Sequence, residues 1–133
     1  MPFVLDASVA IVWALADEDH PLADLTMLEL ERTNALVPPL WWYEVRNVLI
    51  ISERRKRLSV DGSGRYLKLL EALPIETDED RDQEAILLYA RKHQLSLYDA
   101  VYLDVAKRNR LPLATLDKAL RAAAQAASVP LLA

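Results

Sequence analysis

The chain has 133 residues, the usual size of one domain and enough to bury one hydrophobic core. Its apolar content of 53% and charged content of 27% suit a globular protein and argue against disorder. The net charge of −4 is not typical of general nucleic-acid binders, which are usually basic, and the absence of cysteine excludes disulfides, zinc–thiolate sites and thiol catalysis. No apolar run approaches the roughly 18–20 residues of a membrane helix, and no basic segment precedes the first apolar stretch, so we expect a cytoplasmic protein.

Short apolar segments alternate with helical patterns along the whole chain, without repeats or linkers. The apolar segments predict strands at residues 3–5, 36–37, 74–77, 113–114 and 129–132. The helical patterns predict helices at residues 7–16, 21–32, 38–57, 65–72, 97–109 and 117–127, a turn at 61–64, and a further helix that begins in the acidic run 78–82. This alternation predicts one domain over residues 1–133, an α/β fold with a three-layer α/β/α sandwich around a short, mainly parallel sheet.

Two acidic residues directly follow predicted strands and precede predicted helices. Asp6 stands in "FVLDASV", and Asp117 stands in "LATLDKAL", where Thr115 adds a hydroxyl. Each acid alone could be a helix N-cap, because Asp is a preferred capping residue, although Ser8 could cap as well as Asp6. In a parallel α/β sheet, ligands gather at the carboxyl ends of the strands, and both acids fall there.

Glu44 interrupts an apolar helix face, where an unpaired carboxylate is costly. Helical spacing places it on one face with Val48 and Ile51, and Asn47 lies on the same side. The plain alternative is that Glu44 forms an ion pair with a neighbour such as Arg46 across the surface.

Asp99 is the second acid inside an apolar face, which includes Leu95 and Tyr102. Asp104 follows five residues later, a rotation of about 140° around a helix, and lies at ion-pair spacing from Arg108. We therefore expect Asp104 to be an ordinary surface acid and Asp99 to be the site candidate. Asp99 could also be an acid of the first helical turn, placed there for the helix dipole.

Four such acids in one site would repel strongly, because two carboxylates about 5 Å apart repel by roughly 3 kcal/mol at an effective dielectric of 20. A hard divalent cation removes this repulsion, and an all-carboxylate set suits Mg²⁺ or Mn²⁺ and not zinc. His20 and His93 are isolated among charged residues, and we expect them at the surface. A site of this kind activates water for phosphodiester hydrolysis.

The ordered motifs "VLDASV", "YEVRNVL", "LSLYDAVYLDVA" and "LATLDKAL" resemble the PIN-domain family, and more closely the VapC-type toxins of bacterial and archaeal toxin–antitoxin pairs. The resemblance covers nearly the whole chain and implies an Mg²⁺- or Mn²⁺-dependent endoribonuclease acting on tRNA or other structured RNA. The residues that match the four acidic positions of the family are Asp6, Glu44, Asp99 and Asp117. Of these, Asp6, Asp99 and Asp117 are the expected metal ligands. The polar positions near the metal are matched by Ser8, Thr115 and Asn47.

The resemblance also implies a homodimer and a small antitoxin protein whose C-terminal segment enters the toxin groove. A basic cluster could guide the RNA backbone, or could simply be a solvated helix end; its residues are Arg54, Arg55, Lys56, Arg57, Arg65 and Lys68. Four aromatic residues could line a groove or a dimer face, or pack in the core; they are Trp13, Trp41, Trp42 and Tyr43.

Two alternative functions remain at this point. One is a PIN-like module that binds a partner and no longer cuts RNA. The other is a phosphatase of the haloacid-dehalogenase type, which would need a second Asp where this chain has Ser8. A GTPase-like or dinucleotide site is excluded, because neither Gly62 nor Gly64 belongs to a phosphate-cradling loop after a strand.

Overall fold

The computed structural model describes all 133 residues and has a four-stranded parallel sheet at its centre. The strand order is β3-β2-β1-β4, and the strands are β1 (Phe3–Leu5), β2 (Ala35–Val37), β3 (Ile75–Thr77) and β4 (Leu113–Ala114). The central strand β1 is completely buried, and its Val4 is paired with Leu36 of β2 and with Leu113 of β4. All three pairings are parallel because helices connect the strands, as the alternating pattern predicts.

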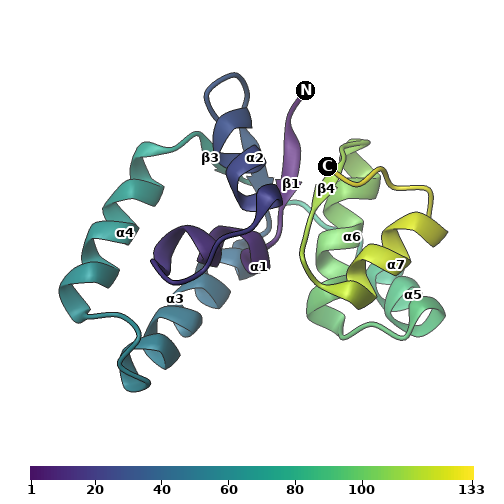
Figure 1. The fold of residues 1–133 in the computed structure, drawn as a ribbon. Helices are drawn as coiled ribbons and strands as arrows, with labels where there is room; N and C mark the ends of the chain where they lie inside the picture. The colour runs from purple at the N-terminus through teal and green to yellow at the C-terminus, as the bar shows by residue number, and fades with distance from the viewer.

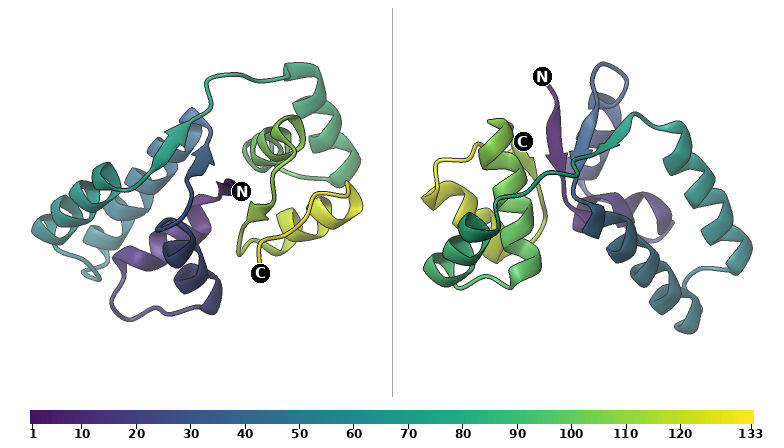
Figure 2. Two further views of the ribbon diagram at one scale, coloured as in Figure 1. Left: turned by 90° about the horizontal axis from the view of Figure 1, so that it is seen from above. Right: turned by 180° about the vertical axis from the view of Figure 1, so that it is seen from behind.

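Helices cover both faces of this sheet, which confirms the predicted three-layer α/β/α sandwich (Figure 1). The helices are α1 (Ala7–Ala10), the 3₁₀ turn η1 (Ile11–Ala14), α2 (Pro21–Glu29), α3 (Pro39–Arg54), α4 (Val60–Ala72), α5 (Gln83–His93), α6 (Leu97–Asn109) and α7 (Lys118–Ala126). Helices α1 to α4 lie on one side of the sheet and α5 to α7 on the other (Figure 2). In the second layer, α6 packs directly on β1, β2 and β4, with α5 and α7 against it.

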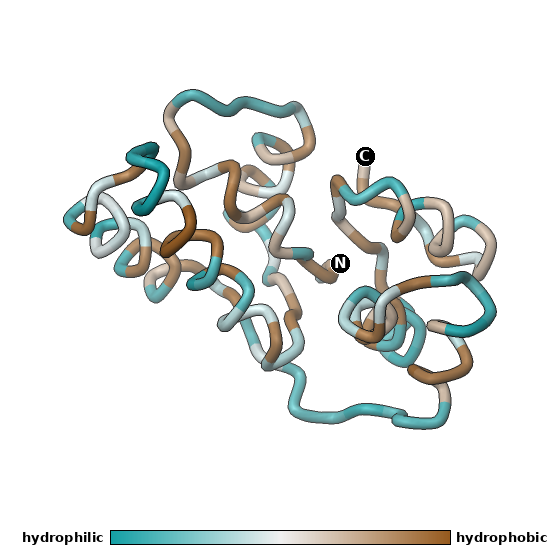
Figure 3. Tube along the Cα trace, turned by 90° about the horizontal axis from the view of Figure 1, so that it is seen from below, coloured by the Kyte–Doolittle hydropathy of each residue, from teal (hydrophilic) through white to brown (hydrophobic).

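The chain passes between the two helical layers once, through the loop from β3 to α5, which is hydrophilic along most of its length (Figure 3). The core is one continuous cluster around the strands, with Trp41 and Tyr102 as its largest fully buried side chains. None of the helices combines the length and the apolar character of a membrane-spanning segment.

The structure corrects two of the predicted elements. The turn predicted at residues 61–64 is wrong, because Ser59 caps α4 by accepting the Gly62 N–H at 2.9 Å and the glycines lie inside the helix. A Cβ at Gly62 would approach Leu58 to 2.9 Å, so this glycine permits the tight entry into the helix. The strand predicted at 129–132 is reduced to a single bridge between Leu131 and Leu113.

The prediction that Asp104 is a surface acid is wrong, because its side chain is only 1% exposed. The predicted pairing with Arg108 is present, with Nε donating to Oδ2 at 2.9 Å. The same guanidinium donates to Asp78 at 2.9 Å, and the Asp82 N–H donates to Asp104 at 3.3 Å. Helix α6 is the middle helix of its layer, so neighbours cover even the side that faces away from Asp99.

Replacement of Arg108 by Ala leaves the buried Asp104 carboxylate without its cation, and we expect the free energy of unfolding to fall by about 3 kcal/mol. The matched control is Arg32→Ala, which breaks the exposed Arg32–Glu29 pair and costs less than about 1 kcal/mol. Urea unfolding at neutral pH measures both. Equal effects of the two substitutions would mean that the Arg108 pair is no stronger than a surface pair.

Candidate active site

Two of the candidate acids are brought together by the pairing of β1 with β4. Leu5 is paired with Ala114, so the residues that follow the two strands emerge side by side at the carboxyl edge of the sheet. Asp6 comes directly after β1, and its N–H donates to the Ala114 carbonyl at 2.9 Å. Asp117 comes three residues after β4, at the start of α7.

The Asp6 carboxylate is held by two hydroxyl groups and not by a helix terminus. Asp6 occupies the N-cap position of α1, but its side chain makes no capping hydrogen bond, so the capping interpretation is wrong for this residue. Its Oδ2 accepts from Ser8 Oγ at 2.6 Å and from Thr115 Oγ1 at 2.7 Å, and the side chain is 5% exposed. Two short bonds therefore fix an almost completely buried carboxylate.

The same hydroxyls tie Asp6 to the β4–α7 connection. Ser8 Oγ accepts from the Leu116 N–H at 3.0 Å, and Thr115 Oγ1 accepts from the Asp117 N–H at 3.1 Å. The prediction of Ser8 and Thr115 as neighbours of the acids therefore agrees with the geometry. Asp117 is also the N-cap of α7, with Oδ1 accepting from the Leu120 N–H at 2.9 Å, which engages only one of its oxygens.

Glu44 reaches the site from α3, on the opposite helical layer from α6. It is half-buried, and its Oε1 accepts a hydrogen bond from the Tyr102 hydroxyl. The alternative ion pair with Arg46 is not formed; that guanidinium donates to the Trp42 carbonyl and lies 5.8 Å from the Trp42 ring centroid. The fully buried stripe of α3 runs beside Glu44, so the acid lies at the margin of the core and not in its centre.

Tyr102 is a site residue that the sequence analysis treated only as part of an apolar face. Burial raises the pKa of its hydroxyl far above the ordinary value, and the charges of Asp6 and Glu44 raise it further. The hydroxyl therefore stays protonated and always donates to Glu44. Its spacing of three residues from Asp99, on the same helix face, was the available signal.

Asp99 lies half-buried in the first turn of α6, so the predicted position in the first helical turn is also correct. Ser96 caps this helix by accepting the Asp99 N–H at 3.1 Å, which leaves the carboxylate without a capping role. Burial raises the pKa of the Asp99 carboxyl, and the negative charges of Asp117 and Asp6 raise it further.

The pKa values of Asp6 and Glu44 are raised by the same two causes. Burial raises the pKa of Asp6, against the lowering effect of its two hydroxyl partners, and the charge of Asp117 adds to the rise. Burial raises the pKa of Glu44, and the charges of Asp6 and Asp99 add to it. No cationic side chain opposes any of these shifts. The structure thus brings the four predicted acids into one electrostatically coupled group that lacks a positive partner.

This donor set fits a hard divalent cation in its chemistry, because it consists of carboxylate and hydroxyl oxygens without histidine or cysteine. No three of the acids converge closely enough to form a complete ligand cage by themselves. Mg²⁺ typically takes only one or two protein carboxylates and completes its shell with water and substrate oxygens, so an open arrangement is compatible with it.

None of the remaining predicted residues forms a hydrogen bond or an ion pair with the four acids. Asn47 is exposed and makes no side-chain hydrogen bond within the protein. Arg57 is paired with Asp17 and Glu18, with 2.9 Å to the latter. The free cations at the end of α3 begin ten residues after Glu44, which is about 15 Å along the helix axis. Two further exposed cations, Arg65 and Lys68, lie on α4.

The aromatic residues divide between core and surface. Trp41 is completely buried, Trp13 donates to the Ala23 carbonyl at 3.0 Å, and Trp42 donates to Thr77 at 2.8 Å. Tyr43 is 74% exposed and is the one aromatic of this set that remains free for an interface.

Three solved structures resemble this one. PAE2754 from Pyrobaculum aerophilum has a TM-score of 0.71 and 27% identity over 92% of this chain and 84% of that chain. A toxin–antitoxin complex from Klebsiella pneumoniae has a TM-score of 0.58 and 19% identity, covering 86% of each chain. FitAcB from Neisseria gonorrhoeae has a TM-score of 0.59 and 17% identity, covering 100% of this chain and 97% of that chain. No protein with a curated description matches the sequence.

The model of the PIN domain family matches residues 3–126, and so includes all four acids. The match agrees with the parallel sheet between two helical layers and with the acids gathered at its carboxyl edge. The resemblance carried by the four sequence motifs is confirmed: this chain belongs to the PIN domain family.

Proposed function

We propose that this chain is a Mg²⁺- or Mn²⁺-dependent endoribonuclease that acts as the toxin of a toxin–antitoxin pair. The observation that carries the proposal is the group of four acids from four separate elements, in which burial and the charges of the neighbouring acids raise the pKa of Asp6, Glu44 and Asp99 without any cationic partner. Such repulsion costs stability, so its presence is typical of a functional site. PIN domains are typically nucleases and generally use divalent metal ions, which supports the same reaction for these acids.

A bound divalent cation would neutralise the carboxylates, shield the developing phosphoryl charge and lower the pKa of a water molecule. Asp6, Asp99 and Asp117 are the residues that would hold it. The chain itself contributes the fixed position of Asp6, because Ser8 and Thr115 leave its carboxylate little freedom to rotate. Preorganisation of this kind avoids a reorganisation cost during the reaction.

Glu44 would orient the attacking water and accept its proton. Its raised pKa makes it a better proton acceptor than an exposed glutamate, and Tyr102 holds one of its oxygens while leaving the other free. The water oxygen bonds to phosphorus as the bond to the 3′ oxygen breaks. The 3′ oxygen takes up a proton, and the products carry a 5′-phosphate and a 3′-hydroxyl.

The toxin assignment is supported by the fold shared with the Klebsiella pneumoniae toxin–antitoxin complex over most of both chains. A small antitoxin that enters the groove with a basic side chain would supply the positive charge that the acids lack. A homodimer remains part of the proposal, and the exposed Tyr43 is a candidate contact residue. A PIN-like module without nuclease activity is the alternative that the following experiments would reveal.

The purified chain should cleave RNA with Mg²⁺ or Mn²⁺ and stop when a chelator is added. Asp6→Asn and Asp99→Asn should each lower kcat at least about 100-fold, because each removes a charge that binds the ion. Asp61→Asn, an exposed acid on α4, is the matched control and should cleave like the wild type. Gel analysis of labelled RNA measures the rates. Full activity of Asp6→Asn would refute the assignment of the site.

The metal-free Asp99→Asn protein should melt at a temperature equal to or higher than that of the wild type. A folded-state pKa that is raised means that the ionised form is destabilised by folding, so stability falls as pH rises through that pKa. The gain should therefore be larger at about pH 7, where Asp99 is ionised, than at about pH 4, near its ordinary pKa.

Thermal melts of both proteins at the two pH values, with and without Mn²⁺, provide the measurement. Mn²⁺ should stabilise the wild type more than the variant, because the variant lacks one expected ligand. A large loss of stability in the metal-free variant would instead identify Asp99 as a structural hydrogen-bonding residue.

Induction of the wild-type chain in cells should arrest growth, whereas induction of Asp6→Asn should not. End-mapping of the RNA from both cultures would identify the cleaved molecules by new 5′-phosphate ends present only with the wild type. If both proteins arrest growth to the same extent, the toxic effect does not depend on Asp6, and the proposed toxin mechanism is contradicted.

A further inference from the structure

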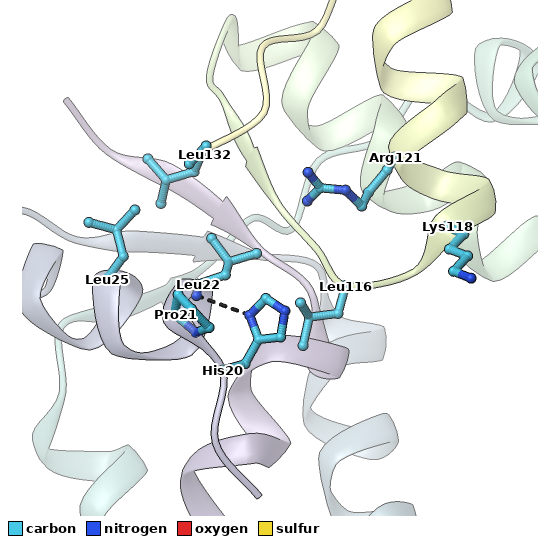
Figure 4. Close-up of a pocket in the computed structure, with 9 residues that line it drawn as sticks. His20, Pro21, Leu22, Leu25, Leu116, Lys118, Arg121 and Leu132 are labelled. Atoms are coloured by element: carbon cyan, nitrogen blue, oxygen red, sulfur yellow. Dashed lines mark hydrogen bonds between the residues drawn. The ribbon is translucent and has the colours of Figure 1, made fainter.

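A pocket of about 510 Å³ lies between α2 and the connection from β4 to α7, beside the acids but outside their cluster (Figure 4). Four leucines form its apolar surface, two from α2, one from the β4–α7 connection and one near the end of the chain; they are Leu22, Leu25, Leu116 and Leu132. The volume lies within the range of small-molecule sites.

The polar part of this pocket is positive. Arg121 and Lys118, both on α7, have no carboxylate within ion-pair distance, whereas Arg57 and Arg108 elsewhere are paired with acids. His20 accepts the Leu22 N–H through Nδ1 at 3.1 Å, so in the neutral ring Nε2 carries the proton and is a donor. The pocket therefore combines an apolar surface with two positive charges that no carboxylate compensates.

Arg121 is fixed in place by its hydrogen bond to the Thr115 carbonyl at 2.9 Å. The Thr115 hydroxyl also binds Asp6, so Thr115 links the guanidinium to the most buried of the four site acids. It nevertheless does not lower the pKa of Asp6, Glu44 or Asp99. Figure 4 shows the guanidinium extending from α7 toward the apolar side chains of the pocket.

The order of residues along the connection places an acidic and a basic site next to each other. Leu116 and Lys118 line the pocket, and Asp117 between them belongs to the acids. A ligand that spans both sites needs two anionic groups. One would bind the cations of the pocket, and the other would bind the metal ion that the acids would hold. An RNA strand has this pattern, with a phosphate at each nucleotide and an apolar base face between them.

We propose that this pocket binds the nucleotide adjacent to the phosphodiester that the acids cleave. Its base packs on the leucines, and its phosphate is bound by Arg121 and Lys118, with the His20 N–H as a further donor. Leucine side chains contact the face of any base and do not read its edges, so the pocket positions the strand without selecting a base. The inference rests on the proposed nuclease function and assigns that site an RNA-positioning pocket.

The test compares single-charge variants in binding to a short fluorescein-labelled single-stranded RNA, measured by fluorescence anisotropy with a chelator present so that no cleavage occurs. Arg121→Gln and Lys118→Gln each remove one positive charge from the pocket. Lys118 makes no hydrogen bond within the protein, so its variant should fold even if the Arg121 variant is destabilised. Arg91→Gln, an exposed and unpaired cation of α5, is the control with the same change of net charge.

Both pocket variants should bind the RNA roughly fivefold more weakly than Arg91→Gln, and the slope of log affinity against log salt should fall by about 0.7 for each lost phosphate contact. Leu132→Ala should weaken binding by about two- to threefold without changing that slope, because it removes only apolar contact. With Mg²⁺ present, the charge variants should raise KM and leave kcat unchanged.

The outcomes separate this pocket from the proposed function. If the wild type cleaves RNA and the pocket variants bind like Arg91→Gln, the nuclease assignment stands and the pocket proposal is overturned; a pocket that serves a partner protein would give this result. If the wild type does not cleave RNA but the pocket variants bind it more weakly than the control, the nuclease assignment fails and only the binding of RNA in this pocket is supported. A wild type that neither cleaves nor binds RNA overturns both.

Discussion

The hydrogen bonds from Ser8 and Thr115 to Asp6 are the interaction on which the rest of the site depends. They hold a carboxylate at the end of the buried strand β1, where burial and neighbouring charges oppose ionisation. Hydroxyl groups can do this without supplying a positive charge, so the acid is positioned but not neutralised. The same two hydroxyls also tie the end of β1 to the β4–α7 connection, because Ser8 and Thr115 accept the N–H groups of Leu116 and Asp117.

Two aspartates of this chain are almost equally buried, but one is paired with a cation and the other has only neutral partners. Asp104 is 1% exposed and has a cation, Arg108, which also binds Asp78. Those bonds tie α6 to the loop after β3, and Arg108 compensates the charge of the buried Asp104 carboxylate. Asp6 is almost equally buried and has only neutral partners. The first arrangement stabilises the layer that carries Asp99, and the second leaves charge available for chemistry.

The sequence was sufficient for the alternation of strands and helices and for the four acids, because both depend on patterns that are local in the chain. It was insufficient where a distant segment decides the environment. Asp104 is buried because α5 and the loop before it cover a helix face that reads as polar. The glycines at 62 and 64 indicated a turn, yet the cap at Ser59 begins the helix before them. The capping interpretation of Asp6 failed because Thr115, which holds it, is 109 residues away.

The single passage of the chain between the two helical layers has a consequence for synthesis in the cell. Asp6 and Glu44 precede the β3–α5 loop, whereas Asp99 and Asp117 follow it, so neither half of the chain holds more than two of the four acids. A nascent chain that ends before Asp117 lacks at least one of the four acids. The complete group of acids therefore assembles only after the segment through Asp117 has been translated and its helical layer has joined the first one.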